Sequence, residues 1–266
     1  MLMLKALRER SIRLLWSGQA LSAIGDEIYR VALIWLAVGL IGEDTGYLAA
    51  AQSGALLILC LVGGRWADHW DHRRTMIGVD AGRALIVLLP VAAYYFGHVT
   101  LPLLFFVALS LSALSAFFEP ALQATLPDVS PDVETLQAAT GLMSTTVRLA
   151  RAVGPAVVGL LAPFLSTIHF FTLDAASFAV SAFSVARLAP SSLAARPSRP
   201  RAGFQESLLS GLSAVAESPL MRDLMLVRFL IGGFWSLSYG LGLALMVRAP
   251  TTTLVEGDQF FDPKVC

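Results

Sequence analysis

Charged side chains are scarce in this sequence. Asp, Glu, Lys and Arg make up 14% of its 266 residues, whereas hydrophobic residues make up 56%. Soluble domains carry about 25% charged residues, and the mean hydropathy of this chain is +0.70. The deficit extends over the whole length, which excludes a large soluble domain and predicts a membrane protein. The net charge is zero, so nothing indicates nucleic acid as a partner.

Cysteine and the familiar catalytic motifs are also lacking. Cys60 and Cys266 lie far apart and form neither a disulfide framework nor a metal signature. There is no Gly-x-x-x-x-Gly-Lys-Ser/Thr loop for a nucleotide, no His-Glu-x-x-His and no Gly-x-Ser-x-Gly. We therefore expect neither an enzyme nor a cofactor. The histidines within residues 68–72 are interpreted as solvated substitutes for basic residues, so we expect no metal either.

Long apolar runs are what the sequence does have. A helix needs about 20 mostly apolar residues to cross the hydrocarbon layer, whereas barrel strands need short segments of alternating polarity. The runs here are long and unbroken, so the predicted fold class is all-α, a polytopic membrane helix bundle. Seven spans are predicted at roughly 14–40, 47–67, 75–97, 101–122, 136–164, 167–188 and 221–247.

The distribution of basic residues predicts an orientation. Arginine and lysine occur before the first span, between the second and third, and after the sixth. The alternate loops, IGEDTG, FGHVT and FLSTIH, contain neither residue. Because basic loops face the cytoplasm, we expect a cytoplasmic N-terminus. The acidic loop TLPDVSPDVE, residues 125–134, is the exception, but acidic residues contribute little to orientation.

The order of these segments predicts four parts. Residues 1–188 form a six-helix transmembrane bundle, and 189–220, rich in Pro, Ser and Arg and then amphipathic, form a cytoplasmic linker with a surface helix. Residues 221–248 form the seventh transmembrane helix, as the start of a second bundle, and 249–266 form an irregular tail. The third and sixth spans also echo each other around Asp80 and Asp174, either as inverted repeats or by chance.

Ionisable residues inside the spans are the candidate functional residues. An ionised side chain in hydrocarbon is costly, so such residues face a wet cavity or each other. Glu27 and Arg30 share a helix face by their spacing, as do Asp80 and Arg83. For the second pair we favour a structural ion pair. The candidates for transport or proton coupling are Asp26, Glu27, Arg30, Asp80, Arg83, Glu119, Arg148 and Arg151.

These candidates differ in the role that we expect. Asp26 and Glu27 are the favoured proton-exchanging groups, because a membrane-embedded acid can bind and release protons. Arg148 and Arg151 either stabilise an anionic partner or pair with the acids. Glu119, which precedes a proline, is either a further candidate or simply interfacial.

One motif between the second and third spans resembles a known family. The pattern Gly-x-x-Ala-Asp-x-x-x-x-Arg-Arg is carried by Gly64, Ala67, Asp68, Arg73 and Arg74. It is similar to the helix 2–3 signature of the major facilitator superfamily. The resemblance implies that the acid contacts a helix end of the second bundle in one conformation and releases it in the other, as a conformational switch.

Three further segments resemble the bacterial drug and siderophore exporter branch of that superfamily: LLWSGQALSAIGDEIYRVAL, FFEPALQATLPDV and RAVGPAVVGLL. The likeness covers roughly residues 10–248. Gly154, Pro155 and Gly159 match the Gly-Pro motif of the fifth helix in its antiporters. The chain departs from the switch pattern at two positions. The family usually has a basic residue where this chain has His69, and a glycine where it has Asp71. The resemblance implies a proton-coupled efflux transporter for small amphipathic molecules, including multiple drugs, in the bacterial inner (plasma) membrane.

The resemblance also bears on the length of the chain. Facilitator transporters have two six-helix halves with the substrate site between them, whereas this sequence offers one half and one further helix. We therefore expect a truncated chain that lacks its C-terminal half as a partner. Such a chain either retains transport, is inactive, or serves as a non-transporting membrane protein or helix-bundle interaction subunit.

Overall fold

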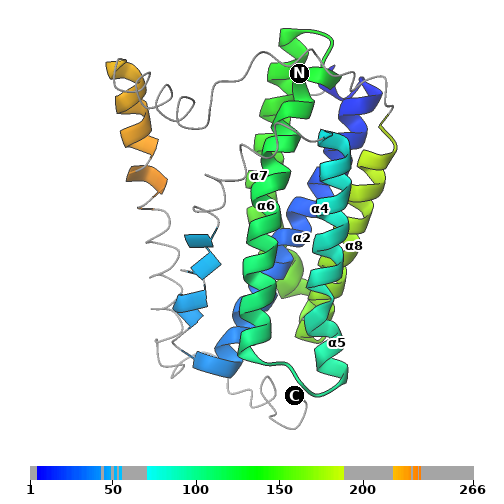
Figure 1. The fold of residues 1–266 in the computed structure, drawn as a ribbon, viewed down its shortest axis with the longest axis vertical. Helices are drawn as coiled ribbons and strands as arrows, with labels where there is room; N and C mark the ends of the chain where they lie inside the picture. Colours follow the sequence, from blue (N-terminus) through cyan, green and yellow to red (C-terminus); the bar gives the residue numbers. More distant parts are fainter. Residues whose placement is uncertain are drawn as a thin grey trace. The chain divides into compact units, whose positions relative to one another are not determined.

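The computed structural model describes two compact units separately, within residues 1–194 and 195–266. The described residues are 5–42, 45–48, 51–52, 54–55, 71–188, 218–228, 230–232 and 234. All regular elements within these ranges are helices, which confirms the all-α prediction for this part of the chain. The elements of the first unit are α2 (Arg10–Ile41), α4 (His72–Val87), α5 (Leu89–Tyr95), α6 (Leu101–Val129), α7 (Val133–Leu161) and α8 (Thr167–Ala186) (Figure 1).

Three stretches among the described residues are long and apolar enough to cross a membrane: His72–Tyr95, Leu101–Val129 and Thr167–Ala186. They correspond to the third, fourth and sixth predicted spans. Helices α2 and α7 have 32 and 29 residues, which at about 1.5 Å per residue also exceeds the hydrocarbon thickness. Both carry several charged residues, and this lowers their apolar character.

The predicted end of the fourth span is wrong. Helix α6 continues beyond residue 122 to Val129, with Pro120 and Pro127 inside it. The reason is burial, because Leu126 and Val129 pack into an apolar cluster, and this outweighs the helix-breaking tendency of proline. The predicted loop at 125–134 shrinks to residues 130–132. Asp132 then begins α7, where its carboxylate accepts a hydrogen bond of 2.7 Å from the backbone N–H of Thr135.

The third predicted span is interrupted. It consists of α4 and α5, which meet at Leu88, and Pro90 lies in the first turn of α5. Proline lacks a backbone N–H and clashes with the preceding turn, so a helix is readily broken just before it. The two helices together still make one stretch of 24 residues.

Two apolar clusters lie at different levels of the bundle formed by α2, α4, α6, α7 and α8. Helix α2 packs against α8 and α7, and α4 packs against α8 and α6 (Figure 1). One cluster includes Tyr29 and Phe171, whose rings meet edge to face at 5.5 Å. The other includes Leu15, Met76 and Val185. Along α2, α4 and α8, buried polar residues lie between the residues of the two clusters.

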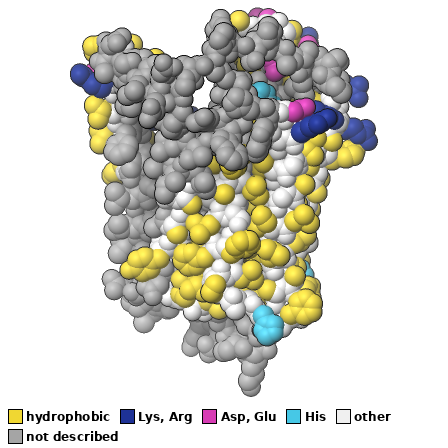
Figure 2. All heavy atoms as spheres, viewed as in Figure 1, with side chains coloured by type: hydrophobic (Ala, Val, Ile, Leu, Met, Phe, Trp, Pro, Cys, Tyr) yellow, Lys and Arg dark blue, Asp and Glu magenta, His cyan; other side chains and the backbone are white. Residues whose placement is uncertain are grey.

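The surface of the first unit is largely apolar. On the face shown in Figure 2, hydrophobic side chains cover much of the described surface, and Lys and Arg gather toward one end. Large apolar residues such as Leu85, Phe106 and Phe183 are more than half exposed. Such a band suits contact with acyl chains rather than water.

Several predicted segments fall mainly outside the described residues. These are most of the second span, the linker at 189–220, the later part of the seventh span and the tail at 249–266. Residues 219–228 are helical, in agreement with the start of the seventh predicted helix. The four-part division of the chain stays a prediction.

Candidate functional site

The candidate site is a polar layer between the two apolar clusters, formed by α2, α4 and α8. Its backbone frame is the close approach of α2 to α8. A methyl group at Gly18 would press on Ser181 and Ser184, and one at Gly25 would overlap Ser177 and Asp174. Small side chains therefore bring the two helices together and leave room for polar groups between them.

Asp80 and Arg83 form the centre of this layer on α4. Arg83 Nη1 lies 3.3 Å from Asp80 Oδ1, and the two side chains are 7% and 0% exposed. The guanidinium also lies over the rings of Phe118 and Phe178, at 4.8 and 5.3 Å from their centroids. The ion pair expected from the i, i+3 spacing is therefore present, and aromatic faces stabilise its cation.

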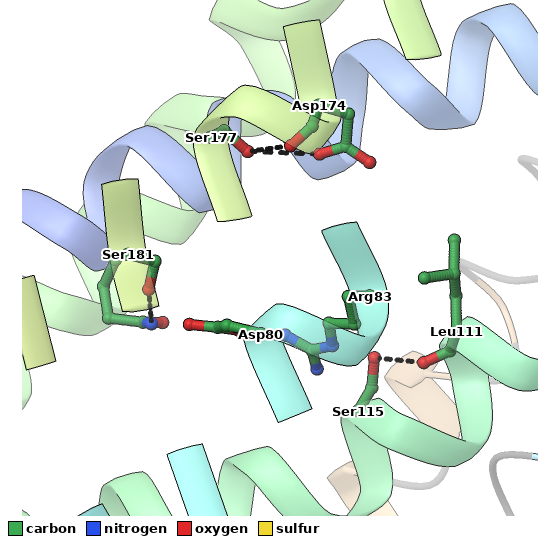
Figure 3. A network of polar contacts seen from close by, with 8 residues as sticks. Asp80, Arg83, Leu111, Ser115, Asp174, Ser177 and Ser181 are labelled. Atoms are coloured by element: carbon green, nitrogen blue, oxygen red, sulfur yellow. Dashed lines mark hydrogen bonds and ion pairs between the residues drawn. The ribbon is translucent and has the colours of Figure 1, made fainter. Parts of the chain in front are cut away.

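Asp174 on α8 lies in the same interior, although it is absent from the predicted transport candidates (Figure 3). Its side chain is fully buried. The hydroxyl of Ser177 donates to its backbone oxygen at 2.8 Å and to its Oδ1 at 3.2 Å. The signals for it in the sequence are its position inside the predicted span 167–188 and the echo that matches Asp174 with Asp80, two aspartates that the fold does place in one polar layer.

The acids of α2 border this layer. Glu27 Oε1 lies 3.3 Å from Arg30 Nη1, and the side chains are 11% and 59% exposed. Asp26 is half-buried and interacts electrostatically with Arg83 and Arg30. Asp26 therefore links the acidic turn of α2 to the buried ion pair of α4.

The Gly-Pro motif of α7 touches this acidic turn. A methyl group at Gly154 would overlap Cβ of Glu27, so α7 and α2 are in close contact at that residue. Pro155 is exposed, and nothing lies within 4 Å of the corresponding point at Gly159. Of the three motif residues, only Gly154 is joined to the candidate acids by this fold.

The remaining charged candidates are not brought to the layer's centre. Arg148 and Arg151 are exposed, and neither forms an ion pair with a described acid, so of their two expected roles the pairing with these acids is not seen among the described residues and the role toward an anionic partner stays a prediction. The arginines are exposed because of the face of α7 on which they lie. Helix α7 buries the face that carries Ala150 and Gly154, whereas Arg148 and Arg151 lie outside that face. Glu119 is also exposed and accepts a hydrogen bond of 3.3 Å from Gln123 Nε2.

The predicted switch motif is only partly described, since Gly64, Ala67 and Asp68 lie outside the described residues. Arg73 donates a hydrogen bond to the carbonyl of Ala186, the last residue of α8. A cation at a helix C-terminus is favourable because unpaired carbonyls and the helix dipole make that end negative. Arg74 is exposed, and its Nε lies 3.6 Å from Oδ2 of Asp71, the N-cap residue of α4.

No group of three His, Cys, Asp or Glu side chains within the described ranges is placed to hold a metal ion. What the site offers instead is a set of carboxyls, one buried guanidinium and hydroxyls, among helices long enough to cross a membrane. Such an arrangement is typical of transporters that move protons or polar substrates.

Comparison with known proteins decides the family. Residues 3–258 match the transmembrane secretion effectors of the major facilitator superfamily. The chain belongs to this family. Its members are multi-pass membrane transporters rather than enzymes, which confirms the family resemblance and the expectation of a non-enzymatic membrane protein.

Individual relatives are 25–30% identical to the chain over the aligned residues. The multidrug efflux pump Tap of Mycobacterium tuberculosis is 28% identical over 218 residues, which cover 78% of this chain and 51% of the pump. The MFS-type transporter YfiS of Bacillus subtilis is 25% identical over 80% of this chain and 51% of its own length. Multidrug resistance protein 1 of Bacillus subtilis is 30% identical over 53% and 34%. The chain spans about half the length of the first two relatives.

Proposed function

We propose that the protein takes part in secondary active transport and exports small amphipathic molecules in exchange for protons. The observation that carries this proposal is the polar layer, in which the acids of α2, α4 and α8 lie inside a bundle with a largely apolar surface. One relative is named a multidrug efflux pump and another a multidrug resistance protein, which supports efflux as the direction and amphipathic compounds as the substrate class. The substrate and the protons are then the small-molecule partners, and the lipid bilayer is the surroundings.

Asp26 and Glu27 are the proposed entry point for protons. Asp26 is half-buried, and Glu27 is joined to the more exposed Arg30. A carboxyl at the border between a buried layer and a more exposed surface can exchange protons with water and with the interior.

The experiment is transport in proteoliposomes with an imposed pH gradient, with a fluorescent lipophilic dye as the substrate. Asp26→Asn and Glu27→Gln remove the titratable groups with little change of shape, and we expect each to reduce proton-driven dye movement at least tenfold. Glu134→Gln is the matched control, because Glu134 is exposed and pairs with Lys5 away from the layer. Unchanged transport in both variants would remove the assignment of these acids.

The membrane orientation is part of the proposal. Basic residues before the first helix and their absence from the 96–100 loop support a cytoplasmic N-terminus. The test uses inner-membrane vesicles that contain the Cys60→Ser/Cys266→Ser variant with one added substitution, Lys5→Cys or His98→Cys. The two new cysteines should react with an impermeant maleimide from opposite sides of the membrane. Labelling of both from the same side contradicts the proposed topology.

A second candidate is a membrane subunit that packs against other helices without transporting anything. The exposed face of α7 favours it, because Arg148 and Arg151 are exposed there without an ion pair to any described residue. A polypeptide equivalent to the remaining half of the relatives is the proposed partner. If the purified chain moves neither dye nor protons, and co-expression with such a half restores both, the subunit role is supported.

A further inference from the structure

The polar layer has more buried carboxyls than buried cations. Within the described residues, the side chains of Asp80 and Asp174 are both 0% exposed, whereas Arg83 is the only buried arginine or lysine. The guanidinium lies on Asp80, with Nη1 3.3 Å from Oδ1. The third buried acid among the described residues, Glu27, pairs with the exposed Arg30. One of the three buried acids therefore lacks a directly paired positive charge.

That acid is Asp174. Among the described residues its carboxyl accepts one hydrogen bond, from the Ser177 hydroxyl to Oδ1, and that hydroxyl also donates to the Asp174 backbone oxygen. The second carboxyl oxygen, Oδ2, is buried and has no hydrogen-bond partner among the described residues. A carboxylate in such a place loses its hydration without a compensating donor, whereas a neutral carboxylic acid loses far less.

Among the described residues, the charged or titratable groups that act on Asp174 lie on α2 and α4. From α2 these are Asp26 and Tyr29, and from α4 they are Asp80 and Arg83. Two of the four are carboxyls that would repel a negative charge on Asp174, and one is the guanidinium already held by Asp80. The backbone of Gly25 also lies close to this carboxyl, because a methyl group there would overlap Asp174 Oδ1.

We propose that Asp174 is a proton-binding carboxyl of the transport cycle, neutral while Arg83 pairs with Asp80 and ionised when Arg83 turns toward it. This inference rests on the proposed function, which it deepens by naming an interior proton site that the acids of α2 serve. Release breaks the O–H bond of Asp174, leaves a carboxylate, and passes the proton to the half-buried carboxylate of Asp26. The guanidinium of Arg83 then balances the new charge, and Asp80 loses part of its pairing.

The first test reads the proton on Asp174 without any transport. Infrared spectra of the purified full chain in lipid bilayers at neutral pH should contain a protonated-carboxyl C=O band that shifts in D₂O. We expect Asp174→Asn to remove one such band and the control Asp128→Asn, at a partly exposed carboxyl of α6, to leave it. An unchanged band in Asp174→Asn overturns the proposal, as does its loss in Asp26→Asn instead.

The second test compares neutral isosteres of two of the buried acids. Asparagine resembles a neutral carboxylic acid, so Asp174→Asn should keep the melting temperature of the wild-type protein at neutral pH. Asp80→Asn should lower it, because Arg83 loses its counter-ion. If Asp174→Asn lowers the melting temperature as much as Asp80→Asn, Asp174 is an ionised structural residue and the proposal is wrong.

The third test concerns transport and separates the two proposals. In proteoliposomes with an imposed pH gradient, Asp174→Asn should bind the dye with unchanged affinity but lose proton-driven movement at least tenfold. Wild-type levels of proton-driven movement in Asp174→Asn contradict the interior site. If the wild-type chain itself moves no protons, the transport function fails on its own, and the infrared band still decides whether Asp174 holds a proton.

Discussion

The charged residues at the ends of the helices and those in the polar layer are chemically alike but have opposite surroundings. At the ends, Asp132 caps α7 from an exposed position, and Lys5 and Glu134 form a pair whose side chains are more than half exposed. In the layer, Asp80 and Arg83 are almost completely excluded from solvent. Water screens and hydrates the first group, so each contact there contributes little to stability. The second group depends on its partners for all compensation.

The difference teaches where function is to be sought. An exposed cap or ion pair has an ordinary structural explanation, and its removal leaves hydrated groups behind. A buried ionisable group is unfavourable for folding unless it is well paired, so its presence in an apolar bundle indicates a task. The variants that follow probe this contrast at successive points between the layer and the helix ends.

Removal of the buried guanidinium should have the largest effect. Arg83→Met leaves Asp80 without its counter-ion, and breaking a buried pair in this way costs about 3–5 kcal/mol. The free energy of unfolding in detergent micelles measures the loss. The double variant Arg83→Met/Asp80→Asn should recover most of it, because no unpaired charge remains. A single variant as stable as the wild type would show that the layer is hydrated like the helix ends.

Filling the space at Gly25 should come next. Gly25→Ala places a methyl group against Ser177 and Asp174, and overpacking of a tight contact costs about 1–3 kcal/mol. Gly78→Ala is the matched control on α4, because nothing lies within 4 Å of its added methyl group. That control should be neutral or stabilising, since alanine favours helix over glycine by up to about 1 kcal/mol. Equal losses in both variants contradict a close α2–α8 contact.

The two neighbouring arginines at the start of α4 should differ. Arg73→Ala removes a hydrogen bond to the last carbonyl of α8, a contact between a cation and a helix C-terminus that contributes about 1 kcal/mol. Arg74 has a side chain that is 86% exposed, so Arg74→Ala should change the unfolding free energy less. Comparison of the two in one detergent decides the point, and a reversed order refutes the α8 contact.

The smallest effect belongs to the exposed cap. Hydrogen bonds from Thr135 hold the pKa of Asp132 below its ordinary value of 3.8. The carboxylate therefore stabilises the folded state above pH 3.8, and this contribution is lost as the pH falls through the lower folded value. Asp132→Asn should be slightly less stable at neutral pH and equal to the wild type in acid. A difference in unfolding free energy between Asp132→Asn and the wild type that stays constant with pH excludes the ionised carboxylate as its cause.

Sequence patterns could predict the helices and the ion pairs within one helix. Long apolar runs require helices in a bilayer, and an i, i+3 spacing places Asp80 beside Arg83 whatever the rest of the fold does. Partners on other helices could not be derived in this way. The proximity of Gly154 to Glu27, and of Gly25 to Asp174, depends on how α7 and α8 pack on α2.

The misplaced features have the same physical origin. The fourth span is predicted to end near residue 122, but the burial of Leu126 and Val129 keeps α6 helical to Val129. Arg148 and Arg151 are charged residues inside a predicted span, which favours an interior position. The rotation of α7 about its axis puts them on its exposed face instead. Composition and spacing describe a helix in isolation, whereas tertiary packing decides its length and the direction of each face.

The seam between α2 and α8 has a mechanical consequence. Its middle section is lined by small groups, with Gly18 and Gly25 on one helix and Ser177, Ser181 and Ser184 on the other, whereas Tyr29 meets Phe171 beyond it. Bulky interlocked side chains must change rotamer when one helix slides along another, whereas these small groups cause little steric hindrance. Within this middle section a short lengthwise shift of one helix along the other therefore meets little steric resistance. Such a displacement would carry Asp174 past Asp26, and it would also move α2 and α8 residues of both apolar clusters.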